Sequence, residues 1–137
     1  MKKIIASLII GLSSMAVFDA QAIHSYQDPV PFKGYVKDIG PLLERVMKRN
    51  HWQLSKDDSG SYFADLNYKD YQVKAKLLVQ DETLAIELIS AQRPNCTKRS
   101  CKVDEDTVDD WLVRLRKQIG LDITKAVRDD ALRKSFM

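Results

Sequence analysis

Three neighbouring segments of this chain alternate between apolar and polar residues, and this pattern constrains the fold more than any other feature. The segments cover residues 62–68, 72–79 and 84–89, and short polar reversals separate them. Alternation with a period of two predicts β-strands that bury one face. Reversals this short predict antiparallel neighbours. We therefore expect an antiparallel meander, preceded by a short strand that begins at Trp52.

Two amphipathic helices are predicted to flank the strands. The first has Asp38 as its N-cap and Asn50 as its stop, and Pro41 is tolerated because it lies in the first turn. The second follows an acidic run at 104–110, which suits the positive end of a helix dipole. Apolar residues recur at helical spacing in both, as Ile39, Leu42, Leu43, Val46 and Met47, and as Val108, Trp111, Leu112, Leu115 and Ile119.

These elements predict an α+β fold with the order α-β-β-β-β-α. We expect a three- to four-stranded meander with both helices packed on one face, and Trp52 and Trp111 as large anchors of the core. The single domain is predicted over residues 37–128. An extended arm at 23–36, pinned by Phe32 and Tyr35, precedes it, and a polar tail that frays follows at 129–137.

Residues 1–22 have the anatomy of a secretory signal peptide. Lys2 and Lys3 precede a mostly apolar stretch, and Ala20-Gln21-Ala22 is a small-x-small cleavage site. The apolar stretch is shorter than the roughly 20 residues that a membrane span needs. We expect cleavage after Ala22 and a periplasmic or secreted protein with no membrane span in the mature chain.

Charge and cysteine content limit the function classes. The chain has 22 basic and 19 acidic residues, and removal of residues 1–22 leaves 20 and 18, a balance that does not favour nucleic acid as a partner. The two cysteines, Cys96 and Cys101, lie in a short polar loop. In an oxidising compartment this pair predicts a local disulfide, whereas redox motifs use the C-x-x-C spacing.

No catalytic constellation stands out in the sequence. The only histidines, His24 and His51, are isolated from each other, and no phosphate-binding glycine loop or metal-ligand pattern is present. The acidic run lacks the glycine and ligand spacing of a calcium loop. We therefore expect a protein that is not an enzyme and that holds no cofactor and no metal.

Two surfaces are candidate binding sites. If the inward set of the strand at 72–79 is Val73, Ala75, Leu77 and Val79, the outward face carries a mixture of lysines and apolar residues: Phe63, Lys74, Lys76, Leu78 and Ile89. The second surface is the basic tip of the cysteine loop, Lys98 and Arg99. For each surface, the alternative interpretation is an ordinary solvated face with no partner.

Residues 39–119 resemble a family of small exported bacterial proteins of unassigned function, many of which are lipoproteins. The resemblance lies in R-N-H-W at 49–52, G-S-Y-F-A-D-L at 60–66 and W-L-V-R-L-R-K-Q-I at 111–119. The chain departs from the family in two respects. It lacks the lipidation cysteine that many members have near the start, and it has the cysteine loop where the family often has a segment rich in serine and asparagine. The resemblance implies the compartment and the fold, and it assigns no functional residue.

Together these features predict a non-enzymatic binding or accessory domain that docks an envelope protein through its open sheet face. The alternative is a cell-envelope module that binds an anionic lipid or polysaccharide through a basic face and loop. Binding of the second kind should weaken steeply with salt, because salt screens exposed charges.

Overall fold

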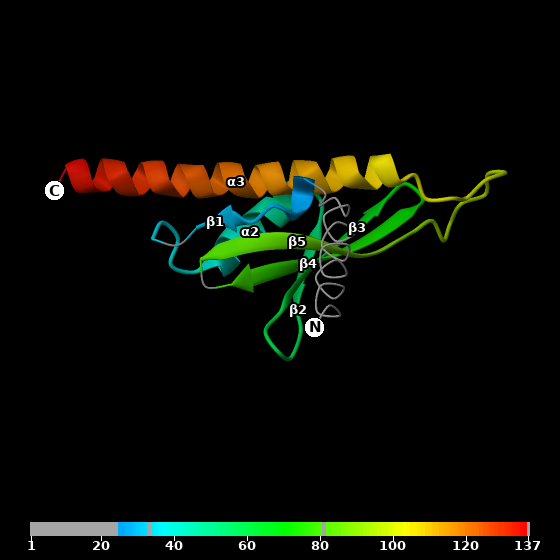
Figure 1. The fold of residues 1–137 in the computed structure, drawn as a ribbon, viewed down its shortest axis with the longest axis horizontal. Coiled ribbons are helices and arrows are strands. Elements are labelled where there is room, and N and C mark those ends of the chain that lie inside the picture. The colour runs from blue at the N-terminus through cyan, green and yellow to red at the C-terminus, as the bar shows by residue number, and fades with distance from the viewer. Residues whose placement is uncertain (1–24, 33, 81, 137) are drawn as a thin grey trace, which may run out of the picture.

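The alternating segments form one antiparallel sheet of five strands, with two helices packed over it (Figure 1). This computed structural model describes residues 25–32, 34–80 and 82–136, so the predicted signal peptide at 1–22 lies outside the described residues. The elements in chain order are η2 (Ser25–Gln27), β1 (Val30–Pro31), α2 (Ile39–Arg49), β2 (Gln53–Lys56), β3 (Tyr62–Tyr68), β4 (Tyr71–Gln80), β5 (Thr83–Gln92) and α3 (Glu105–Ser135). The α+β class predicted from the sequence is confirmed.

The sheet contains the expected meander and one further strand. Its strand order is β1-β5-β4-β3-β2, so β2 to β5 are neighbours in chain order. The fifth strand, β1, belongs to the segment at 23–36 that the sequence predicts as an extended arm, and it pairs with the start of β5 through Val30 and Pro31. The expectation of three to four strands is therefore too low by one. A two-residue strand leaves no periodicity to detect in the sequence.

Helix α2 begins and ends where its capping residues predict. The Asp38 carboxylate accepts a hydrogen bond from the Gly40 backbone N–H at 3.1 Å, and Asn50 is the C-cap. Asn50 donates from its side chain to the Val46 carbonyl at 2.7 Å, which satisfies one of the open carbonyls at the helix end. Its five predicted apolar residues are all buried: Ile39, Leu42, Leu43, Val46 and Met47.

The core lies between the helices and the inner face of the sheet. Trp52 is buried there, while Trp111 is half-buried at its edge. The strands contribute their inward sets: Ala64, Leu66, Val73, Ala75, Leu77, Leu84 and Ile86. Val79 is an exception to the predicted inward set, since it is 40% exposed. β3 reaches only to the Tyr62–Leu77 pair, so the end of β4 has a neighbouring strand on one side only.

The amino-terminal arm is more ordered than a loose extension. Tyr26, Val30 and Phe32 are buried in the core cluster, and Arg116 of α3 donates a hydrogen bond to the Asp28 carbonyl at 2.8 Å. Phe32 pins the arm as predicted. Tyr35 does not, because its side chain is 50% exposed.

Helix α3 corrects the expectation of a frayed tail after Asp129. It continues through Gly120 to Ser135, and Val127 still packs against the core. The last turns are polar but helical, with a Lys134–Asp130 ion pair at 3.1 Å and basic residues in the final turn, where the helix dipole favours them. No helix within the described parts of the chain is both long and apolar enough to cross a bilayer.

Candidate functional site

The outer face is the surface of β3, β4 and β5 opposite α2 and α3, and it carries four of the five residues predicted from the sequence: Phe63, Lys74, Lys76 and Leu78. Phe63 lies opposite Lys76 in the β3–β4 register, and Leu78 lies opposite Ala85 in the β4–β5 register. Lys74 and Ile89 are exposed, and the other three are half-buried. The register is consistent with Phe63, Lys74, Lys76 and Leu78 sharing one face, and it does not place Ile89 among them.

The two lysines of the outer face lie beside the aromatic ring of Phe63. The Lys74 ammonium is 5.0 Å from the ring centroid and the Lys76 ammonium is 6.0 Å from it. The register places an acidic residue opposite each lysine, since Asp65 faces Lys74 and Glu87 faces Lys76. The positive charges of the face are therefore matched by negative charges one strand away.

Ile89 is exposed because the β4–β5 register shifts at this point. Ala75 pairs with Leu88 and Lys74 pairs with Ser90, so Ile89 is an extra residue with no partner on β4. A bulge of this kind redirects the side chain of the extra residue. The Ile89 side chain is 46% exposed, and Ile89 lines a hollow with Tyr26, Val108 and Asp109, on the side of the arm and α3 rather than with the predicted outer-face residues.

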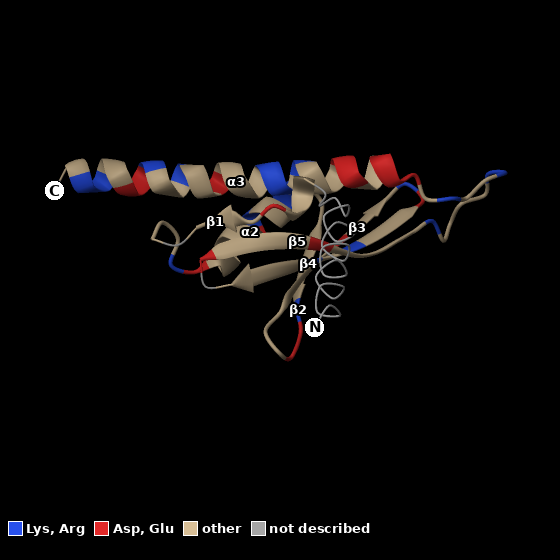
Figure 2. Ribbon diagram, in the orientation of Figure 1, with Lys and Arg blue, Asp and Glu red and all other residues tan. Residues whose placement is uncertain are grey.

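The cysteine loop is closed by the predicted disulfide. Cys96 and Cys101 are bonded, with their Cα atoms 5.7 Å apart, which lies in the usual range for a disulfide. Lys98 and Arg99 lie within the closed loop and are exposed. Figure 2 shows this loop as a basic projection at one end of the molecule, beyond the acidic start of α3.

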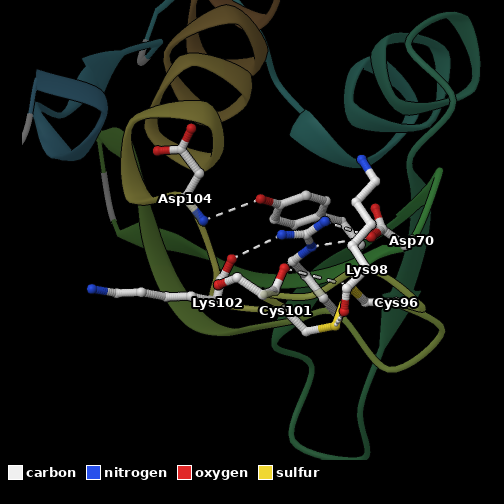
Figure 3. Close-up of polar contacts among 9 residues, drawn as sticks. Asp70, Cys96, Lys98, Cys101, Lys102 and Asp104 are labelled. Carbon is white, nitrogen blue, oxygen red and sulfur yellow. Dashed lines mark hydrogen bonds and ion pairs between the residues drawn. A yellow bond between two sulfur atoms is a disulfide. The ribbon is translucent and has the colours of Figure 1, made fainter.

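The base of the loop is fixed by a polar network around Arg93 (Figure 3). The guanidinium donates to Asp70 Oδ2 at 2.7 and 3.1 Å and to the Lys102 carbonyl at 2.9 Å. It also stacks over Tyr71, 4.9 Å from the ring centroid, and the Tyr71 hydroxyl accepts from the Asp104 backbone N–H at 3.1 Å. The network joins the β3–β4 turn, the end of β5 and the start of α3.

Charge in this network shifts the pKa of Asp70. The hydrogen bond from Arg93 lowers the pKa of this carboxyl below its ordinary value, and the nearby charge of Lys98 lowers it further. In Figure 3 the Lys98 side chain extends over the turn that holds Asp70. Lys98 therefore lies near a carboxylate. Arg99 forms no ion pair within the described parts of the chain.

The acidic clusters of the sequence have local structural roles. Asp104 caps α3, since its carboxylate accepts from the Asp106 backbone N–H at 3.2 Å and from the Thr107 hydroxyl at 2.8 Å. Asp57 closes the β2–β3 turn by accepting from the backbone N–H groups of Ser59 and Ser61. Within the described ranges, no three His, Cys, Asp or Glu residues gather closely enough to hold a metal ion.

A concave site that the sequence reasoning missed lies between the end of α2, β3 and α3. Its lining includes Arg49, His51, Trp52, Tyr68, Trp111 and Arg114. His51 follows the C-cap of α2 in a left-handed conformation with φ of 65°. The sequence signal for this site is the run R-N-H-W at 49–52, and nothing in that run by itself indicates a pocket.

Comparison with known proteins gives no relative from which a function could be transferred. No known protein family matches the sequence, and no curated protein is significantly similar to it.

Proposed function

We propose that this protein is a non-enzymatic binding domain of the bacterial cell envelope that docks a protein partner through its outer face. The observation that carries the proposal is the presence of the half-buried Phe63 and Leu78 among charged side chains on the outer face. Protein interfaces of the non-obligate type are about as apolar as the rest of a surface. A sheet face with a few apolar side chains among charged ones fits that composition.

The charge pattern of the outer face favours a protein over an anionic polymer. Lys74 and Lys76 are opposed across the strands by Asp65 and Glu87. A polyanion is attracted by an excess of positive potential, and a face whose positive and negative charges are matched has little such excess. A protein partner can instead complement charges of both signs.

The envelope location rests on two features. One is the secretory pattern of residues 1–22, with cleavage after Ala22. The other is the Cys96–Cys101 disulfide, because disulfides persist in oxidising compartments such as the periplasm and the extracellular space. The resemblance to small exported bacterial proteins supports the same location.

The second candidate function is recognition of an anionic lipid or polysaccharide through the loop tip. Lys98 and Arg99 are exposed, and the disulfide and the Arg93 network restrict the loop that carries them. Such binding should fall steeply as salt rises, since exposed charges are screened.

The test of the proposal is photo-crosslinking in cells from single positions. We expect a crosslinker at position 78 or 74 to give one discrete protein adduct, because both positions lie on the outer face. A crosslinker at Lys117, an exposed lysine of α3, is the matched control and should give none of that adduct. Leu78→Asp should abolish the adduct formed from position 74.

Adducts of equal yield from positions 74 and 117, or the absence of any adduct from the outer face, would reject the proposal. Salt-sensitive binding to vesicles of anionic lipid, lost on the double change Lys98→Ala and Arg99→Ala, would then support the second candidate.

A further inference from the structure

The pocket between α2, β3 and α3 has an apolar floor and an aromatic mouth. Its volume is about 290 Å³, near the lower end of the range of about 300–1,000 Å³ that is usual for small-molecule sites. Trp52, Leu66 and Leu115 are buried beneath it. Tyr68 and Trp111 stand at its edge with their rings perpendicular, 5.7 Å between centroids. The pocket therefore offers aromatic surface to a small flat or apolar group.

The polar groups of the pocket are predominantly cationic. Arg49, His51 and Arg114 line it, and none of the described residues that line it is acidic. Arg114 is exposed and makes no ion pair in the described parts of the chain, even with Asp110 one turn earlier on α3. The middle turns of α3 are basic in Figure 2, after an acidic start.

Arg49 is held in place while keeping donors available. Its Nη2 atom contacts Asp122 Oδ1 at 2.7 Å, and Asp122 is only 6% exposed. A guanidinium has five N–H donors in a fixed fork, so one contact with Asp122 leaves others for a ligand. The buried carboxylate thus fixes the orientation of an arginine whose side chain is half exposed at the pocket.

The backbone at His51 ends α2 and turns the chain into the pocket wall. His51 adopts a left-handed conformation at the helix end, where glycine is the usual residue. The carbonyls of the last α2 turn already accept hydrogen bonds, with Trp52 N donating to Met47 O at 2.9 Å and His51 N to Lys48 O at 3.4 Å. These two hydrogen bonds form the usual helix-ending motif, which places Trp52 directly after the helix and against the pocket.

We propose that this pocket binds a small amphiphilic anion, a carboxylate attached to an aromatic or compact apolar body. The apolar body would lie against Trp52 and Trp111, and the carboxylate would accept hydrogen bonds from the guanidinium groups of Arg49 and Arg114. Planar guanidinium groups match carboxylates in geometry, and bonds between charged partners are the strongest class of hydrogen bond in proteins. The site is separate from the outer face and does not depend on the function proposed above.

The test is an NMR titration of the purified protein with phenylacetate, compared with the neutral phenylacetamide. The chain has two tryptophans, and both line the pocket, so their two indole N–H signals report directly on it. We expect phenylacetate to shift both signals saturably. We expect phenylacetamide to bind about tenfold more weakly, because it lacks the charge that the arginines recognise.

Paired variants separate the pocket from general surface charge. Arg114→Gln should weaken phenylacetate binding about tenfold, since it removes one charged donor from the exposed rim. Arg128→Gln, which removes an exposed arginine farther along α3, should leave the affinity unchanged. Equal affinity for the acid and the amide, equal effects of the two variants, or indole signals that do not move would each overturn the proposal.

Discussion

His51 holds a backbone conformation that carries a cost for any residue with a side chain. Its φ is 65°, and Lys69 in the β3–β4 turn has the same conformation with φ of 54°. A left-handed residue other than glycine costs roughly 1–2 kcal/mol. Replacement by glycine removes that cost where few contacts are lost.

We expect His51→Gly to raise the free energy of unfolding by about 1 kcal/mol. The His51 side chain is exposed, so few contacts are lost with it. The measurement is urea denaturation followed by circular dichroism. Lys69→Gly is the matched variant for stability and should gain a similar amount, whereas His51→Gly should also weaken phenylacetate binding. A loss of stability in His51→Gly would show that its imidazole stabilises the helix end.

Asp70 makes the stability of the protein dependent on pH. Its pKa is lowered by the hydrogen bond from Arg93, so its contribution is fully present above the ordinary carboxyl pKa of about 3.9. The contribution is lost as the pH falls through the lower pKa of the folded state. Removal of the Asp70 charge should therefore lower the stability of the protein at neutral pH and leave it nearly unchanged in acid.

We expect Asp70→Asn to have a lower melting temperature than the unmodified protein at pH 7, with a difference that shrinks as the pH falls below about 4. The control is Asp130→Asn, which breaks an exposed pair with Lys134. Exposed pairs contribute little, so its melting temperature should stay close to that of the unmodified protein across the same range. A difference for Asp70→Asn that persists undiminished at pH 2 would contradict the ionic role.

At the level of elements, the cysteine loop is held in two ways. The disulfide closes it, and the Arg93 network fixes its base to the β3–β4 turn and to α3. These constraints act on different residues, so loss of one leaves the other intact.

We expect the double change Cys96→Ser and Cys101→Ser to lower the free energy of unfolding by about 2 kcal/mol, because the disulfide closes a short loop in the unfolded chain. Unfolding should stay cooperative, and amide shifts in the folded protein should be confined to the loop. Guanidinium denaturation and a two-dimensional NMR spectrum measure these outcomes. Shifts that spread into β4 would show that the disulfide, rather than Arg93, positions the loop base.

The elements that the sequence predicts well are those with local signals. Asp38 and Asn50 mark the ends of α2 because their side chains bond to backbone groups within four residues. The strand β1 was not predicted because its two residues gain their conformation from β5, more than fifty positions away. Helix α3 runs through Gly120 without interruption, and the apolar residues at helical spacing on both sides of it explain why.

At the level of the whole molecule, the sequence predicted the outer face better than the pocket. Strand alternation alone assigns Phe63, Lys74 and Lys76 to one side of a sheet. The pocket requires three segments at 49–52, 66–68 and 111–115 to meet, and only tertiary packing brings them together. The bulge at Ile89 is equally nonlocal, since it is defined by the register with β4.

Helix α3 also gives the molecule a mechanical property. It has 31 residues, which at 1.5 Å per residue make a rod about 46 Å long. In Figure 1 the rod runs over the sheet, and its last turns extend past the sheet on the side away from the cysteine loop. The turns after Val127, which still packs against the core, therefore project as a helical arm, and a transverse force on Ser135 would bend the helix about its contacts at Ile123 and Val127.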